Sequence, residues 1–182
     1  WNEDKEQITS VVIEEGITSI GDYAFSYCSS LSDIEIPNNI TNLSVQMFSM
    51  CTGIKNITFH GAKTIESGCF NGVYYVDNVY FDNTEDFVKM KYNNYDSVPW
   101  VKNSMIKTYN FSGDPVNIYI NGEIIKNITV PNGIKTINDL AFSCIFSLES
   151  IEMTDETESI GGSAFRSCAS LSQIKIPEEV TE

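Results

Sequence analysis

The residues of this chain best suited to chemistry are five cysteines and a single histidine, His60. Cysteine clusters bind zinc, and a cysteine beside a histidine can act as a nucleophile with its base. No Cys-x-x-Cys pair occurs, and His60 occupies a strand-end position where proline stands elsewhere in the chain. We therefore expect neither a zinc site nor a catalytic Cys–His pair.

Carboxylates are abundant, but they are dispersed along the chain. Asp82, Glu85 and Asp86 are the closest approach to a calcium site, yet they lack the ligand order of a calcium loop, and a solvated face is the simpler interpretation. The chain contains no phosphate-cradling glycine loop, no nucleophile elbow and no His-Glu-x-x-His motif. The expectation is a protein that is not an enzyme and that holds no catalytic residues, metal or cofactor.

The charge balance excludes some partners. The formal net charge is -14 with a pI of about 4.3, which repels phosphate backbones and anionic lipid, so nucleic-acid binding is not expected. No run of about 18 apolar residues is present, so membrane insertion is not expected either. The sequence does not open with a basic and then apolar segment, and targeting signals are expected outside it.

An internal repeat organises most of the chain. The phrase IGDYAFSYCSSLSDIEIP at Ile20 returns as IGGSAFRSCASLSQIKIP at Ile160, with eleven of eighteen letters identical. A phenylalanine column sets a period of 22 or 23 residues within each half of the chain: Phe25, Phe48, Phe70, Phe142 and Phe165. A second column, three residues later, contains Cys28, Cys51 and Cys168. So many positions in phase predict a stack of similar units.

Each unit carries its own structural signals. The segment L-x-x-I-x-I ends in the period-2 alternation of a short half-buried strand, and Pro37, Pro131 and Pro177 stop that strand. In the segment DYAFSYC, Ala24, Phe25 and Cys28 are at helical spacing, which predicts one helical turn. One unit is too small to bury its own apolar face. Stacked units about 4.8 Å apart would pair their strands in parallel and build the core from neighbouring copies.

These residues carry a family resemblance. The stretch LSDIEIPNNITNLSVQMFSMCTG resembles the 23-residue unit of BspA-like leucine-rich repeat proteins, over residues 8–82 and 125–182. The resemblance implies a leucine-rich-repeat solenoid of the α/β horseshoe type, with short parallel strands on one face and short helical turns and loops on the other. Residues 8–82 would form a first array and residues 125–182 a second, within one continuous solenoid.

Residues 83–124 interrupt the period and are expected to form an insert. Thr84 is a possible N-cap of a short helix ending near Asn94, and Asn121-Gly122 predicts a hairpin. Its aromatic residues have two interpretations: they plug the break between the arrays, or they form a binding surface. These residues are Phe87, Tyr92, Tyr95, Trp100, Tyr109, Phe111 and Tyr119, of which Tyr95 and Trp100 are the binding candidates.

The cysteines fit the repeat as small buried hydrophobic residues. Cys28 and Cys51 would be neighbours, so a disulfide is conceivable, although parallel Cβ vectors suit bridge geometry badly. Five Asn-x-Ser/Thr triplets are possible glycan acceptors, although an Asn- and Ile-rich composition also produces them: Asn39, Asn42, Asn56, Asn110 and Asn127.

Function is left to positions that packing does not use. The outward column of the strands and the positions beside it form a candidate binding strip: Asp33, Glu35, Asn56, Thr58, Asn78, Tyr80, Glu152 and Lys175. A broad shallow recognition surface and an ordinary solvated sheet face would both look like this.

The resemblance implies a secreted or surface-attached adhesion or protein-binding module, outside the cell, whose partners are host matrix or cell-surface proteins. Carbohydrate recognition with Tyr80, Tyr95 and Trp100 as stacking platforms is the alternative, and an accessory region of a larger secreted enzyme is a third. Repeat units with uncapped apolar ends also suggest end-to-end self-association.

Overall fold

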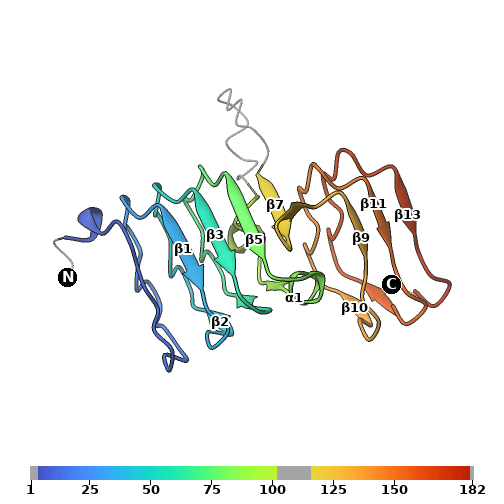
Figure 1. Ribbon diagram of the computed structural model, residues 1–182, viewed down its shortest axis with the longest axis horizontal. Helices are drawn as coiled ribbons and strands as arrows, with labels where there is room; N and C mark the ends of the chain where they lie inside the picture. Colours follow the sequence, from blue (N-terminus) through green and yellow to red (C-terminus); the bar gives the residue numbers. More distant parts are fainter. Residues whose placement is uncertain (1–3, 102–115, 181–182) are drawn as a thin grey trace.

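The computed structural model describes residues 4–101 and 116–180 of the chain. They form an elongated stack of coils, whose long strands follow one another along the longest axis from β1 to β13 (Figure 1). A short 3-10 helix, η1 (Lys5–Gln7), precedes the stack. The predicted repeat solenoid is confirmed: this is a β-solenoid of about six turns, with mostly parallel strands and little helix.

The main sheet runs along the first part of the stack. Its order is β1-β3-β5-β7-β8, and the first four strands pair in parallel. Its strands are β1 (Asp33–Ile36), β3 (Asn56–Phe59), β5 (Asn78–Phe81), β7 (Asn117–Ile120) and β8 (Glu123–Ile124). Along β1, β3, β5 and β7 every second residue is buried, which is the alternation that the L-x-x-I-x-I pattern predicts.

Three smaller sheets complete the coils. In the second array the long strands pair in the order β13-β11-β9, from β9 (Asn127–Thr129), β11 (Ser150–Glu152) and β13 (Gln173–Lys175). Two-residue strands make a second wall: β2 (Asn42–Leu43), β4 (Thr64–Ile65) and β6 (Lys91–Tyr92) in the first array, and β10 (Thr136–Ile137) and β12 (Ser159–Ile160) in the second.

The Ala-Phe segment forms tight turns, so the helical turn predicted there is wrong. Tyr23 and Tyr27 have φ values of 58° and 67°, which no right-handed helix tolerates. Their turns close through hydrogen bonds from Ser26 N–H to Tyr23 and from Cys28 N–H to Phe25. Alternate N–H groups point to the next coil instead, as when Phe25 N–H donates to Met47 at 3.0 Å. The coils are therefore joined by hydrogen bonds on this side as well.

The core consists of side-chain ladders that pass from coil to coil. The rings of Phe25, Phe48 and Phe70 stack with centroid distances of 5.4 and 5.7 Å. Phe142 and Phe165 stack at 5.3 Å in the second array. Cys28 and Cys51 are fully buried and free, whereas Cys168 is half-buried in the last complete coil. All these side chains belong to or pack against one hydrophobic cluster.

The first part of the expected insert forms a coil of its own. The helix α1 (Thr84–Val88) is shorter than predicted, and its N-cap is Asn83 rather than Thr84, because the Asn83 side chain accepts the Asp86 N–H at 2.9 Å. The helix stops early because β6 follows at once and pairs with β4. A 3-10 turn, η2 (Tyr95–Ser97), then takes the place of the Ala-Phe turns, since the Phe70 N–H donates to Asp96.

The last part of the insert extends the main sheet. β7 pairs in parallel with β5, and Asn121-Gly122, both with positive φ, turns the chain into the antiparallel strand β8. The hairpin predicted at this pair therefore forms. Two of the insert aromatics, Tyr109 and Phe111, and the triplet at Asn110 lie outside the described residues.

No helix in residues 4–101 and 116–180 is long and apolar enough to cross a membrane. In β13, the inward-facing Ile174 is 42% exposed, and Ile176, which follows the strand, is 53% exposed. End-to-end self-association through such a coil stays a prediction.

Candidate binding surface

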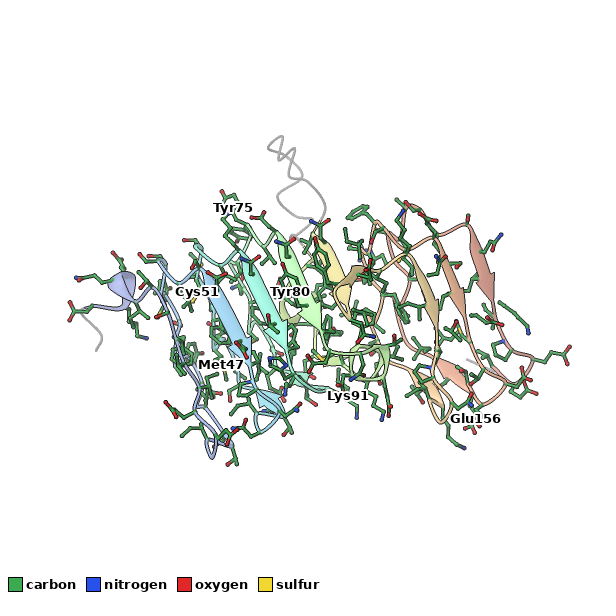
Figure 2. The ribbon with its side chains drawn as sticks, in the orientation of Figure 1. Met47, Cys51, Tyr75, Tyr80, Lys91 and Glu156 are labelled. Atoms are coloured by element: carbon green, nitrogen blue, oxygen red, sulfur yellow. The ribbon has the colours of Figure 1, made fainter. Side chains whose placement is uncertain are left out.

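The outward side chains of the long strands form one strip across the main sheet, here called the ribbon. One row contains Asp33, Asn56, Asn78 and Asn117, and the next contains Glu35, Thr58, Tyr80 and Tyr119. The strand register places the members of each row opposite one another on successive coils. Figure 2 labels Tyr80 on β5, in the middle of this sheet.

The second array continues both rows. The register pairs Ser150 with Asn127 and Gln173, and Glu152 with Thr129 and Lys175. The sheet itself is interrupted between the arrays, because β8 ends one sheet and β9 begins the next. The candidate residues Glu152 and Lys175 therefore belong to a different sheet from the six candidates of the first array.

Amide hydrogen bonds tie the first row of the ribbon together. Asn56 Nδ2 donates to Asp33 Oδ1 at 2.7 Å, Asn78 Nδ2 to Asn56 Oδ1 at 2.9 Å, and Asn117 Nδ2 to Asn78 Oδ1 at 3.1 Å. This chain of hydrogen bonds ends on the carboxylate of Asp33. Hydrogen bonds from Ser32 and Asn56 to this carboxylate lower its pKa. These side chains are thus held in one arrangement before any partner arrives.

Two stacked tyrosines dominate the second row. The rings of Tyr80 and Tyr119 lie 4.9 Å apart and 17° from parallel. Both are half-buried, and stacking covers one face of each ring. Asn117 and Tyr119 were not among the predicted ribbon residues because residues 83–124 were taken as an insert. The sequence does contain the pattern of a further long strand here, since Asn117-Ile-Tyr-Ile repeats the pattern of Asn78-Val-Tyr-Phe.

A histidine between two carboxylates lies at the carboxyl end of the long strands, directly after β3. His60 Nε2 is 3.0 Å from Glu35 Oε1, and His60 Nδ1 is 2.9 Å from Asp82 Oδ2. Partial burial acts to lower the pKa of His60, but the hydrogen bonds and charges of Asp82 and Glu35 outweigh it and raise the pKa above its usual 6.5. The contact links three successive coils.

A shallow depression lies on the second array. Its lining includes Thr129, Glu152, Thr154, Asp155, Glu156 and Lys175. Glu156, labelled in Figure 2, already accepts a hydrogen bond from the Gly133 N–H. Within residues 4–101 and 116–180, no group of three His, Cys, Asp or Glu side chains is placed to hold a metal ion.

Tyr95 and Trp100, the two binding candidates of the insert, lie at the junction of the arrays. The prediction that Trp100 is exposed and stacks on a sugar is wrong. Trp100 is only 2% exposed, packs against the rings of Phe81 and Tyr92, and donates its indole N–H to Ser143 O at 2.9 Å. A large apolar ring is more stable in this break than in water. Tyr95 is half-buried, and its hydroxyl accepts a hydrogen bond from Arg166 at 2.7 Å.

Comparison with known proteins gives a family match. The model of the BspA type leucine rich repeat region matches residues 3–95 and 116–182, in six copies. No curated protein matches the sequence. The matched ranges include β6 and β7, which agrees with their pairing in the two sheets of the first array.

Comparison with solved structures gives three matches to report. The pneumococcal vaccine antigen PcpA is 15% identical, with a TM-score of 0.51 over 88% of this chain and 42% of its own. A leucine-rich repeat protein from Bacteroides ovatus is 18% identical, with a TM-score of 0.39 over 95% of this chain and 56% of its own. A leucine rich cell surface protein from Faecalibacterium prausnitzii is 20% identical, with a TM-score of 0.35 over 92% of this chain and 45% of its own.

This chain spans less than two thirds of each of these structures. At 15% identity, the likeness to PcpA concerns the fold alone. The family match covers most of the sequence, and the matched ranges contain the Phe, Cys and Leu columns that pack together in the structure. The chain belongs to the BspA type leucine-rich repeat family.

Proposed function

We propose that this chain is the non-catalytic repeat scaffold of a cell-surface or secreted module that binds other proteins through the ribbon. Host matrix proteins and cell-surface proteins are the partners we favour. The fold supports the surface location, because PcpA, which is similar in fold, is a pneumococcal vaccine antigen. The family match supports it as well.

The observation that carries the proposal is the ordered ribbon on the main sheet. Its side chains are not needed in the core, yet hydrogen bonds and ring stacking fix them across four strands. A surface already fixed in this way loses little side-chain entropy on binding, which favours a protein partner with a flat contact face. Tyrosine and asparagine side chains are also frequent in the binding surfaces of antibodies.

The negative charge of the chain indicates which kind of protein it binds. The chain has a formal net charge of -14, and Glu35 on the ribbon is 74% exposed. An acidic surface speeds association with a basic partner and makes that association sensitive to salt. We therefore propose a partner with a basic contact region, and binding that weakens as the salt concentration rises.

The test is capture of matrix and cell-surface proteins by the chain, with variants on the ribbon. Tyr80→Ala and Tyr119→Ala together should weaken capture at least about tenfold, since central aromatic residues dominate many interfaces. The control is Tyr27→Asn: Tyr27 is 60% exposed on the turn side, and asparagine tolerates its positive φ. Equal capture by the ribbon variant and the wild type would contradict the proposal, as would the absence of any captured protein.

Carbohydrate binding is the second candidate, and the Tyr80–Tyr119 pair is what favours it. Sugars stack on exposed ring faces, and each of these rings keeps one face that the other does not cover. Burial of Trp100 removes one of the three platforms that this alternative used. Binding to a glycan array that is lost in the Tyr80→Ala, Tyr119→Ala variant, without protein capture, would favour this candidate instead.

A further inference from the structure

His60 makes contacts that a neutral imidazole cannot satisfy. Each ring nitrogen faces a carboxylate: Nε2 lies 3.0 Å from Glu35 Oε1, and Nδ1 lies 2.9 and 3.0 Å from the two oxygens of Asp82. An ionised carboxylate only accepts hydrogen bonds, and a neutral imidazole has only one N–H. Both contacts are hydrogen bonds only when both nitrogens of His60 are protonated.

We infer that His60 is a pH-sensitive clasp across the first array. As an imidazolium ion it joins Glu35 of β1 to Asp82, the residue after β5, through its own position after β3. When it loses one proton it releases Glu35 and stays bound to Asp82. This device depends only on the contacts of His60 and not on the binding function proposed above.

The geometry decides which carboxylate is released. Nδ1 approaches both oxygens of Asp82, whereas Nε2 approaches one oxygen of Glu35. The Asp82 side chain is 45% exposed and that of Glu35 is 74% exposed, so Glu35 exchanges its contact for water more easily. The remaining proton is therefore kept on Nδ1, and the lone pair of Nε2 then repels the Glu35 carboxylate.

Two other charged groups, Lys63 and Asp86, lie near the carboxyl ends of these strands. Lys63, in the same coil, donates to Pro37 O at 2.8 Å, and burial lowers its pKa to about 8, against the charges of Asp86 and Asp82. Asp86 lies in α1 and acts on Lys63. The groups that act on His60 itself are Asp82 and Glu35, so its titration reports the clasp.

The sign of the pH effect follows from linkage. The pKa of His60 is raised in the folded protein above the usual 6.5. Between pH 6.5 and this raised pKa, the folded state therefore holds a proton that the unfolded state has released. The stability that the clasp contributes is complete below about pH 6.5 and is lost as the pH rises through the raised pKa of His60.

A direct test is the NMR titration of His60 in the whole chain, which contains a single histidine. We expect a midpoint above 6.5, and above that midpoint a neutral ring whose proton is on Nδ1. Glu35→Gln and Asp82→Asn should each lower the midpoint by roughly half a unit or more. Glu152→Gln, at the position of β11 that corresponds to Glu35, is the matched control and should leave the midpoint unchanged.

A midpoint at or below 6.5, or one that neither substitution moves, overturns the inference. A neutral ring protonated on Nε2 would overturn the assignment of Glu35 as the released group. Urea unfolding of His60→Gln gives an independent measurement: between about pH 6 and about pH 7.5 the wild type should lose stability relative to this variant. A constant difference across that range would also overturn the clasp.

Discussion

At the scale of single residues, the thiols of the first array are packing groups. Burial raises the pKa of Cys51 to about 12, against a hydrogen bond from the backbone of Cys28, and it raises the pKa of Cys69 further. The Cys51 thiol donates to Phe25 O at 3.0 Å. A thiol held in its neutral form is a poor nucleophile and a poor metal ligand, so the column of Cys28 and Cys51 contributes apolar volume.

Lys63 is the residue whose burial should be visible in the pH dependence of stability. Its side chain is buried near the carboxyl ends of the long strands, and burial lowers its pKa from 10.5 to about 8. Between these values the unfolded chain holds a proton that the folded chain has released, so the free energy of unfolding should rise with pH. Urea unfolding at several pH values between about 8 and about 10.5 measures this rise.

Lys63→Met should remove most of that rise, because methionine fills a similar volume without titrating. Lys135→Met is the control, since Lys135 is an exposed partner of Glu158. Identical pH slopes in the wild type and in Lys63→Met would contradict this account of Lys63.

The contacts of single residues were the least predictable feature of the molecule. The types of Glu35, His60 and Asp82 are visible in the sequence, but their contact depends on the register of three strands and on side-chain rotamers. The burial of Trp100 was equally unpredictable from the sequence. An aromatic residue in a non-repeating segment is as consistent with packing between the arrays as with exposure on a binding surface.

At the scale of elements, close approach between neighbouring coils selects glycine at position 53. A Cβ atom there would overlap the carbonyl oxygens of Ser29 and Leu31 in the coil before it. Gly53→Ala should therefore destabilise the fold by about 1–3 kcal/mol, which thermal or urea unfolding will measure. At Gly21 a Cβ meets nothing within 4 Å, so Gly21→Ala should change stability by less than about 1 kcal/mol. Equal effects at the two positions would argue against this packing of the coils.

The long strands and the hairpin turn at Asn121-Gly122 were predictable, and the Ala-Phe turns were not. Period-2 alternation and the prolines locate the long strands, because burial of one face dictates both signals. The Ala-Phe turns contain left-handed residues such as Gln46, Met50 and Leu140, which are not residues that favour that conformation. Only the hydrogen bonds to the next coil, as from Met50 N–H to Asn71 O at 2.7 Å, explain this backbone, and a local pattern does not reveal them.

At the scale of the whole molecule, the period of 22 or 23 residues is sufficient to predict the solenoid. It is not sufficient to place the segment from Asp82 to Ile125, where the 22- or 23-residue spacing is lost but β6 and β7 still pair with the first array. The physical reason is that backbone pairing tolerates many side chains. A coil can thus keep its place in the sheets after its consensus residues have been replaced.

The junction between the arrays shows how the stack continues through the break in the sheet. The ring of Phe87 from α1 lies 5.6 Å from that of Phe142, and Asn138 donates to Met90 O at 2.9 Å. Together with Trp100 these contacts join both arrays into one hydrophobic cluster. The described coils are therefore expected to unfold as one cooperative unit.

The central claim is that each coil forms part of the core of its neighbour, and a double-mutant cycle tests it directly. Phe48→Leu and Phe70→Leu alter rings that stack at 5.7 Å, so their effects on the free energy of unfolding should be coupled by about 0.5–1.5 kcal/mol. The same cycle with Phe48→Leu and Phe165→Leu, in separate arrays, should give coupling below about 0.5 kcal/mol. Coupling between Phe48 and Phe70 no larger than that between Phe48 and Phe165 would contradict the claim.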